Sequence, residues 1–339
     1  MRSEKEDVER QTEDRSLRGQ VDRIVNPDQP ERDQPRDDAT EKKDGDYIRH
    51  GQEPASEEAR KVLQQAPDQA EEMKKGVKGP EQPHQSHNGK AIIETFDIKK
   101  AFGSHQVLNG VTCQIPEGEI SVIMGPSGTG KSVMLRHFVG LLMPDSGDVV
   151  VDGKSVPKLS ETKLLDLRRN MGMLFQDGAL FSSMNLFDNV AFPLRQHTKE
   201  SEGKIREIVM SRLKEVGLAG AEKRMPNELS GGMRKRAGFA RALVLEPKIL
   251  LFDEPDSGLD PVRTALLCEL IKDIQRKYGS TAVVISHDIK AVFEIADHIV
   301  LLHGGKVVDQ GPKEQLRNSD NQFTQQFIQG AVMGPLGMD

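Results

Sequence analysis

The sequence has few of the residues and runs that define several classes of protein: it has 2 cysteines among 339 residues, no tryptophan and 4% aromatic residues. Two cysteines exclude a disulfide framework. Cys113 and Cys268 each fall in an expected core element, so we predict buried, reduced thiols in a cytosolic protein. No stretch approaches the roughly 18–20 consecutive apolar residues that a membrane-spanning helix needs. The chain is therefore expected not to cross a bilayer by itself.

Basic charge is in excess in neither of the two main parts of the chain. Residues 1–90 contain 17 Lys and Arg against 22 Asp and Glu, and the remaining residues contain 30 against 31. A nearly neutral remainder does not support electrostatic capture of nucleic acid, which needs a concentrated basic surface, so we expect no nucleic-acid partner. The start of the chain, Met1–Asp7, lacks the apolar core of a signal peptide and is too acidic for an organelle transit sequence.

Residues 1–90 also lack apolar surface. They are rich in Gln, Asp, Glu, Arg and Pro, and Tyr47 is their only aromatic residue. A segment with so little to bury does not offset the entropy of ordering, so a polar, disordered N-terminal extension is predicted. A short amphipathic helix at Glu57–Ala66 is the alternative for part of it.

The stretch that organises the rest matches G-x-x-x-x-G-K-[ST] and follows an apolar run at 120–124, which is expected to be a buried strand. It consists of Gly125, Pro126, Ser127, Gly128, Thr129, Gly130, Lys131 and Ser132. Its glycines bring backbone N–H groups near phosphate oxygens, and the helix starting at Val133 directs its positive end at the anion. Lys131 is expected to contact the β- and γ-phosphates, and the Ser132 hydroxyl to bind Mg²⁺. The alternative is a glycine-rich turn that binds nothing.

Three further apolar runs lead into polar residues, and ligands of parallel sheets bind at the carboxyl ends of strands. Asp253 suits a direct or water-mediated Mg²⁺ contact, and Glu254 suits a base that polarises a water. His287 could donate to a γ-phosphate. Gln176 could direct its carbonyl toward Mg²⁺ or a water. The ordinary alternatives, a turn, a packed histidine and a solvated glutamine, stay open.

Two weaker candidates complete the site. Ser230, Gly231 and Gly232 precede an expected helix at Arg234–Leu245, which makes either a second anion site or simply a capped helix start. Phe102 could stack on an adenine ring, because an aromatic face tolerates any base, or it could pack in the core.

The periodicity predicts an α/β protein with a parallel-sheet core around the phosphate loop and an antiparallel strand group at residues 91–118. A helical lobe is inserted, and its apolar stripe consists of Ile205, Ile208, Val209, Leu213 and Val216. The predicted divisions are residues 1–90, an ordered domain at 91–330 with its helical subdomain at about 178–245, and a C-terminal tail at 331–339. A hairpin is expected around Gly304 and Gly305, and a last helix near Asn321–Ile328.

Taken together, these motifs resemble those of the ATP-binding cassette family over roughly residues 91–330. Gly125–Ser132 resembles its Walker A motif, Gln176 its Q-loop, Leu229–Met233 its signature, Ile249–Asp253 its Walker B motif followed by Glu254, Ser257–Asp260 its D-loop and His287 its switch histidine. The resemblance implies a P-loop NTPase cassette with a RecA-like core, and it places Phe102 where the family has its adenine-stacking aromatic residue.

The signature departs from the usual L-S-G-G-Q, because Met233 replaces the amide side chain and puts its hydrogen bond to nucleotide in doubt. The segment 229–237 is nevertheless similar to the Mce/Mla branch of lipid-transporting ATPases, as are the segments 174–181 and 326–335. The similarity is strongest to the actinobacterial Mce-associated ATPases of this branch. The polar region 1–90 is not part of the resemblance.

The resemblance implies an ATPase subunit that binds ATP and Mg²⁺ and works as a homodimer. In one copy Lys131, Glu254 and His287 act on the γ-phosphate, and Ser132, Gln176 and Asp253 hold the metal. Ser230, Gly231, Gly232 and Asp260 complete the ATP site between the two copies.

The implied function is transport of a phospholipid, fatty acid or sterol across the cell envelope. The implied partners are integral-membrane permease subunits and an Mce/Mla-type lipid-binding protein, with the ATPase peripheral on the cytoplasmic face of the cell membrane. The alternatives are the ATPase of another ABC importer and that of the cell-division ABC complex.

Overall fold

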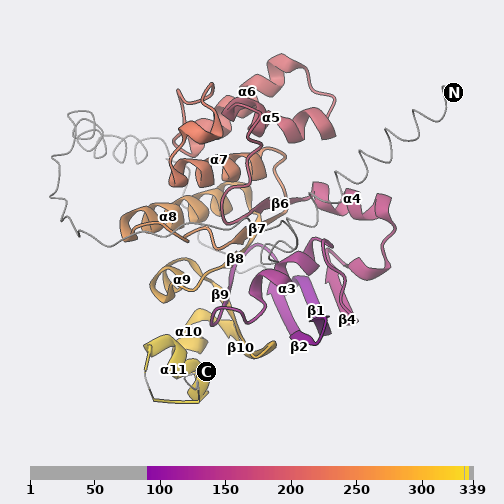
Figure 1. Ribbon diagram of the computed structural model, residues 1–339, viewed down its shortest axis with the longest axis vertical. Helices are drawn as coiled ribbons and strands as arrows, with labels where there is room; N and C mark the ends of the chain where they lie inside the picture. Colours follow the sequence, from indigo (N-terminus) through magenta and orange to yellow (C-terminus); the bar gives the residue numbers. More distant parts are fainter. Residues whose placement is uncertain (1–89, 332, 336–339) are drawn as a thin grey trace, which may run out of the picture. The chain divides into compact units, whose positions relative to one another are not determined.

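The computed structural model describes residues 90–331 and 333–335 (Figure 1). The predicted polar extension, with its alternative helix at Glu57–Ala66, lies outside the described residues, as do residues 336–339. The predicted domain divisions therefore stay predictions.

A four-stranded antiparallel sheet comes first, in the order β2-β1-β4-β5. Its strands are β1 (Ala91–Phe102), β2 (His105–Pro116), β4 (Ser146–Val151) and β5 (Lys154–Ser155). Burial alternates along β2, because one face of the sheet packs on the core and the other meets solvent. The pairing of β1 shifts between Thr95 and Ile98, where Asp97 has φ 47°, so a bulge bends this strand.

A six-stranded sheet forms the core, in the order β10-β9-β3-β8-β7-β6. Its strands are β3 (Ile120–Met124), β6 (Met171–Leu174), β7 (Ile249–Asp253), β8 (Thr281–Ile285), β9 (His298–His303) and β10 (Lys306–Pro312). All neighbours are parallel except β9 and β10, which form the expected hairpin. Every residue of β3, β7 and β8 is buried, which explains why they read as unbroken apolar runs.

Helix α3 (Lys131–Phe138) packs between the two sheets. Its Met134, Leu135 and Phe138 join Leu251 and other residues from one face of the six-stranded sheet in a single cluster. Residues of the opposite face, such as Leu250, pack in a second cluster with α7 (Gly231–Leu243), α8 (Pro261–Tyr278) and α9 (Ile289–Ile295). The core sheet is therefore covered on both faces.

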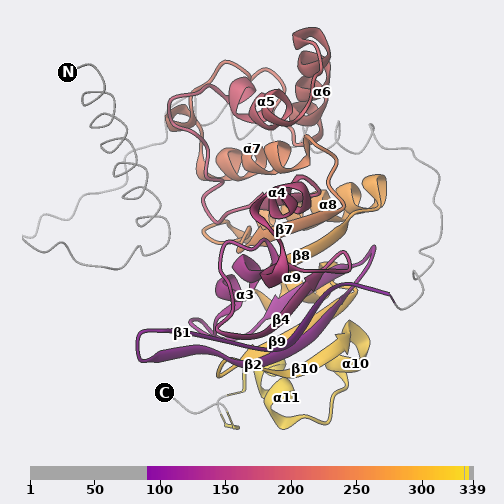
Figure 2. The ribbon, with the colours of Figure 1, turned by 90° about the vertical axis from the view of Figure 1, so that its right-hand side faces the viewer.

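Helices α5 (Leu186–His197), α6 (Glu202–Glu215) and α7 gather beyond the β6 edge of the core sheet (Figures 1 and 2). Four residues of the predicted stripe are buried, and the fifth, Ile208, packs against them partly exposed. The remaining helices are α4 (Glu161–Arg169), α10 (Lys313–Arg317) and α11 (Gln322–Gln329), with short 3₁₀ turns at Val156–Lys158 and Pro226–Glu228. The structure thus confirms the predicted α/β class with an antiparallel group and inserted helices.

The parallel register brings the functional segments to one edge. Asp253 at the end of β7 lies opposite Ile285 of β8, and Ile285 lies opposite Ile123 of β3. Whatever follows these three strands therefore emerges side by side. Among the described residues, no helix has the length and apolar character to span a bilayer. Cys113 and Cys268 are free and buried, and burial raises the pKa of each thiol to about 12.

Candidate functional site

The phosphate loop follows β3 and turns sharply into α3. A side chain at Gly125, where φ is 146°, would meet the backbone carbonyl of Leu302. At Gly130, where φ is 95°, it would meet the Leu108 side chain at 2.7 Å. Only glycine fits these two positions, because both the left-handed conformation and the close neighbours exclude a Cβ atom. The loop backbone is thereby held in a tight cradle.

Helix α3 begins with unsatisfied donors that face this cradle. Its first helical hydrogen bond is donated by the Met134 N–H to the Gly130 carbonyl at 2.8 Å. The N–H groups of Lys131, Ser132 and Val133 precede that bond and have no acceptor within the helix. Gly130 is the N-cap and supplies no capping side chain. The helix start can therefore satisfy these donors with an anion.

Lys131 lies folded along the same loop. Its side chain is 5% exposed, and its ammonium donates to the carbonyls of Gly125 at 2.9 Å and Pro126 at 2.8 Å. Burial lowers the pKa of Lys131, while the nearby Glu254 and Asp253 carboxylates oppose that shift. A buried cation that rests on neutral carbonyls is well placed to transfer to phosphate oxygens.

Ser132 and Asp253 meet across this edge of the sheet. The Ser132 hydroxyl donates to Asp253 Oδ1 at 2.7 Å, and burial raises the pKa of the Asp253 carboxyl. A hydroxyl and a carboxylate side by side are hard oxygen ligands of the kind that Mg²⁺ takes together with phosphates. Among the described residues, no group of three or more His, Cys, Asp and Glu could hold a metal without such a ligand. The residues present therefore fit a nucleotide-bound Mg²⁺ rather than a preformed metal cage.

Glu254 and His287 form a pair next to this position. His287 Nδ1 lies 3.8 Å from Glu254 Oε1, and the side chains are 60% and 22% exposed. Glu254 has φ 47°, and its N–H donates to the Ile285 carbonyl at 3.1 Å. A non-glycine residue at positive φ is strained, and such strain clusters at functional sites. The arrangement holds a carboxylate toward the cradle with a titratable ring beside it.

The signature segment is also a helix start, but the structure corrects its expected position. The predicted helix at Arg234–Leu245 begins three residues earlier, at Gly231, because the Ser230 hydroxyl caps it by accepting from the Met233 N–H at 3.3 Å. Gly231 is exposed. Within the described residues, no hydrogen bond joins Ser230 to the phosphate loop of the same chain.

The remaining predicted residues lie around this edge. The Gln176 amide donates to the Ser257 hydroxyl at 3.2 Å, so it reaches the D-loop in this state. Asp260 caps α8 by accepting from the N–H groups of Val262 and Arg263. Phe102, at the end of β1, is 40% exposed with Lys100 Nζ 5.8 Å from its ring centre, so it does not pack in the core.

Sequence reasoning missed Lys235 and the residues that surround it. Lys235 is buried in α7, and its ammonium donates to the Ser257 carbonyl. The spacing along the helix could have indicated that Lys235 is buried. Lys235 lies three residues before Gly238 and four before Phe239, which places it on the buried face of α7.

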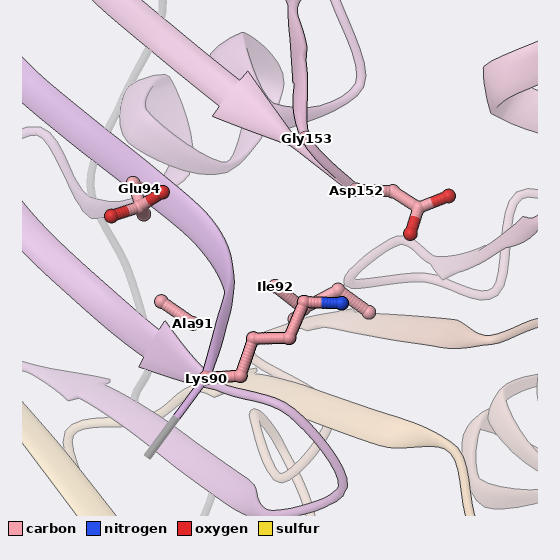
Figure 3. A pocket seen from close by; sticks show the side chains of 6 residues that line it. All are labelled: Lys90, Ala91, Ile92, Glu94, Asp152 and Gly153. Carbon is pink, nitrogen blue, oxygen red and sulfur yellow. The ribbon is translucent and has the colours of Figure 1, made fainter.

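A separate pocket of about 340 Å³ lies away from this site (Figure 3). It is lined by Lys90, Ala91, Ile92, Glu94, Asp152 and Gly153. It lies at the end of β1 opposite Phe102 and contains none of the predicted site residues.

Comparisons with known proteins place these motifs in context. The family model described as "ABC transporter" matches residues 108–257. The "Probable ribonucleotide transport ATP-binding protein mkl" of Mycobacterium leprae is 51% identical over 246 residues, covering 73% of this chain and 71% of the relative. The "Intermembrane phospholipid transport system ATP-binding protein MlaF" of Escherichia coli K12 is 42% identical over 245 residues, covering 72% and 91%.

Solved structures agree with these relatives. The structure titled "Dimeric structure of a post-hydrolysis state of the ATP-binding cassette MJ0796 bound to ADP and Pi" matches with a TM-score of 0.61 and 32% identity, covering 65% of this chain and 98% of that one. The structure titled "Structure of cbiO1 from clostridium perfringens: Part of the ABC transporter complex cbiONQ" matches with a TM-score of 0.61 and 30% identity, covering 71% of this chain and 99% of that one.

Proposed function

Because this chain belongs to the ABC transporter family as an ATP-binding, ATP-hydrolysing subunit, we propose that it powers lipid transport across the cell envelope through a membrane permease. The observation that carries the ATPase chemistry is the convergence of Lys131, the Ser132–Asp253 pair and the Glu254–His287 pair at one edge of the core sheet. The similarity to MlaF supports a phospholipid or related lipid as the cargo.

Each residue of one chain has a definable task in this proposal. The free N–H groups at the start of α3 bind the phosphates, and Lys131 exchanges its two loop carbonyls for oxygens of the β- and γ-phosphates. Ser132 and Asp253, with Gln176 as a further proposed ligand, would hold Mg²⁺, which would supply neutralising charge to the phosphate oxygens. Phe102 offers its exposed face to the adenine.

Hydrolysis then depends on Glu254, whose backbone is strained, and on the neighbouring His287. Glu254 orients the attacking water for in-line approach to the γ-phosphorus and draws its proton. His287, 3.8 Å away, holds Glu254 in place and donates a hydrogen bond to a γ-phosphate oxygen. As the bond to the γ-phosphorus breaks, negative charge develops on the β-phosphate, where Lys131 stabilises it.

We infer that two copies enclose each nucleotide. The exposed start of α7 is formed by Ser230, Gly231 and Gly232, and Ser230 makes no hydrogen bond to the phosphate loop of its own chain among the described residues. This helix start can therefore bind the γ-phosphate held by a partner copy. Asp260 is the N-cap of α8, and we assign the D-loop that it ends to the same surface facing the partner. The dimeric state named for the MJ0796 structure supports this arrangement.

The helical lobe is proposed to pass the movement on to permease subunits. Gln176 links the end of β6 to the D-loop at Ser257, so a nucleotide that moves Gln176 also affects the lobe that follows it. The name of MlaF, an ATP-binding protein of an intermembrane phospholipid transport system, supports peripheral attachment of this chain to membrane subunits. We further propose that it attaches at the cytoplasmic face of the membrane and works with an Mce/Mla-type lipid-binding protein.

A second cargo class comes from the name of the mycobacterial relative, which specifies ribonucleotides. The deciding experiment purifies this chain with its membrane subunits and identifies the bound cargo by mass spectrometry, in wild type and in the Glu254→Gln variant. We expect a lipid whose release requires ATP in wild type and which stays bound in Glu254→Gln. A ribonucleotide other than the ATP or ADP of the two cassette sites, bound to the membrane subunits in place of lipid, would overturn the lipid proposal and leave the ATPase chemistry standing.

A further inference from the structure

Lys235 is a charged side chain in a buried position. It lies on α7 with 6% of its surface exposed, and its ammonium donates to the backbone carbonyl of Ser257. Ser257 belongs to the segment between β7 and α8 of the core, whereas α7 packs with the inserted helices α5 and α6. A buried lysine is costly unless its ammonium is paired, so this contact joins two parts of the molecule at a definite point.

The segment that Lys235 holds has two more attachments. The Gln176 amide donates to the Ser257 hydroxyl at 3.2 Å, from the loop that follows β6. The Ser286 hydroxyl donates to Asp256 Oδ2 at 2.7 Å, from the end of β8 directly before His287. Asp256 and Ser257 are therefore tied to the Q-loop, to the signature helix and to the histidine segment at once.

Several carboxylates surround the buried ammonium of Lys235. Burial lowers the pKa of Lys235, and the nearby carboxylates of Asp256, Asp177 and Glu254 oppose that shift by favouring the charged lysine. Within the described part of the chain, the Oδ1 atom of Asp256 is buried and has no hydrogen-bond partner. Removing the ammonium would leave these acids with one compensating charge fewer in a desolvated setting.

We propose that Lys235 is a positioning residue that fixes the D-loop to the signature helix, so that Ser230–Gly232 and Asp260 approach the partner's nucleotide as one rigid unit. Lys235 lies one and a half turns after Ser230 on the same helix, and Ser257 lies three residues before Asp260. The hydrogen bond from Lys235 to Ser257 thus links the two surfaces that are proposed to close the partner's site. This inference rests on the proposed ATPase dimer.

The test compares Lys235→Met and Lys235→Arg in the full chain assembled with its membrane subunits. Lys214→Met, an exposed lysine on α6, is the matched control. We expect kcat for ATP hydrolysis to fall about tenfold in Lys235→Met, since a small misplacement of groups at a reacting centre has effects of this order or larger. Lys235→Arg should recover part of that loss, because it keeps the charge and the donors.

A merely structural role would not produce the split that we expect between closure and nucleotide binding. In the unassembled chain, Lys235→Met should bind a fluorescent ATP analogue as wild type does, because the phosphate loop is intact. In a Glu254→Gln background, ATP-driven dimerisation should be weakened by Lys235→Met and unchanged by Lys214→Met. Hydrogen exchange should increase at residues 256–260 and not at 125–132.

Two results would overturn the inference. The first is wild-type kcat and dimerisation in Lys235→Met, and the second is a loss of nucleotide binding equal to the loss of kcat. If Lys235→Met does not fold, the same measurements on Lys235→Gln decide in the same way. A Lys131→Ala variant measured in parallel separates the two proposals, because full turnover in that variant would contradict the proposed ATPase site itself.

Discussion

The phosphate loop at 125–132 and the signature segment at 229–233 use the same device, the N-terminus of a helix, in two different settings. In α3 the N-cap is Gly130, which contributes no side chain, and the loop before it folds around Lys131. In α7 the N-cap is Ser230, whose hydroxyl is already engaged with the Met233 N–H. One helix start is enclosed by its own chain, and the other faces outward.

In the proposed dimer, this difference would divide the tasks of one ATP site between two copies of the chain. Around the phosphate loop, the cation, the hydroxyl and the carboxylate already have partners inside the chain, so the loop is preorganised before nucleotide arrives. The signature segment has no such partners from the loop, and it gains a function only when a phosphate is presented to it. Variants at the two helix starts should therefore fail in different ways.

The largest effect is expected at the enclosed helix start, from Lys131→Ala. Removing the ammonium deletes the charge that neutralises the β- and γ-phosphates, and loss of one preorganised donor of this kind costs about 10²–10³ in turnover. Nucleotide affinity should fall as well, since Lys131 is proposed to contact the phosphates both before and during the reaction. Steady-state ATPase assays and nucleotide titrations measure the two losses.

Lys154→Ala, an exposed lysine of β5, is the control for that change and should behave as wild type. Normal turnover in Lys131→Ala would show that the enclosed helix start takes no part in ATP hydrolysis, and it would contradict the proposed contrast between the two helix starts.

The next effect is expected at the outward helix start, from Ser230→Arg. A bulky side chain there should lower turnover by about 10²-fold, because groups that complete a transition-state site contribute on this scale. Binding of nucleotide to the unassembled chain should not change. ATPase rates and analytical ultracentrifugation of an ATP-trapped Glu254→Gln background measure turnover and closure.

Ser201→Arg provides a closely matched control, because Ser201 also caps a helix by accepting from the N–H three residues on, at the same 3.3 Å. Both variants lose a cap worth about 1 kcal/mol, so any further loss in Ser230→Arg reports its position and not its cap. Equal turnover in the two variants would contradict an interfacial role for the signature segment.

Much of this comparison was within reach of the sequence, because strands that are buried on both faces read as apolar runs and a phosphate loop has a fixed spacing. The start of α7 was predicted three residues late, since glycines at 231 and 232 favour a loop by propensity while the Ser230 cap favours a helix. Helix α8 was not among the expected elements, although Asp260, Pro261 and Gly279 mark both of its ends.

The contacts around the D-loop could not be predicted in the same way. Lys235 and Ser257 are 22 residues apart, and Asp256 and Ser286 are 30 apart, so their pairing depends on how whole elements pack. A lysine in a helix is by itself usually a solvated residue. The assigned roles of the individual site residues stay predictions, whereas the fold and the ATPase class are confirmed.

A smaller effect, on stability, is expected from a variant in the helical lobe of α5, α6 and α7, which carries the outward helix start and not the enclosed one. Arg212 of α6 is buried, pairs with Glu215 at 3.0 Å and Glu246 at 2.5 Å, and contacts the Tyr278 hydroxyl. Arg212→Met removes a buried cation, while Glu215 keeps its ion pair with Lys277 at 2.6 Å and Glu246 is exposed, so the variant should lower the free energy of unfolding by about 1–3 kcal/mol. Chemical denaturation measures this, with the exposed Arg206→Met as control.

Nucleotide binding at the phosphate loop should survive Arg212→Met at temperatures where the variant is folded. If that variant loses nucleotide affinity in proportion to its stability, the two helix starts are not independent, and the contrast between them would have to be abandoned.

The smallest effect concerns the sheet beneath the enclosed helix start and depends on pH. His298 opens β9 beside Ser121 of β3, is 9% exposed, and has its pKa lowered by burial from 6.5 to about 4. Between these values the unfolded chain binds a proton that the folded chain does not, so folding stability falls as pH drops through that window and is fully present above it. Between about pH 7 and about pH 5 the expected loss is about 1–2 kcal/mol.

His298→Gln removes this proton and should flatten that part of the stability curve, which urea denaturation at several pH values measures. His197, an exposed residue at the C-terminal end of α5, offers the control substitution. His197→Gln should leave the slope of wild type unchanged. Parallel curves for wild type and His298→Gln would show that the acid sensitivity of the folded chain arises elsewhere than in the sheet that supports the phosphate loop.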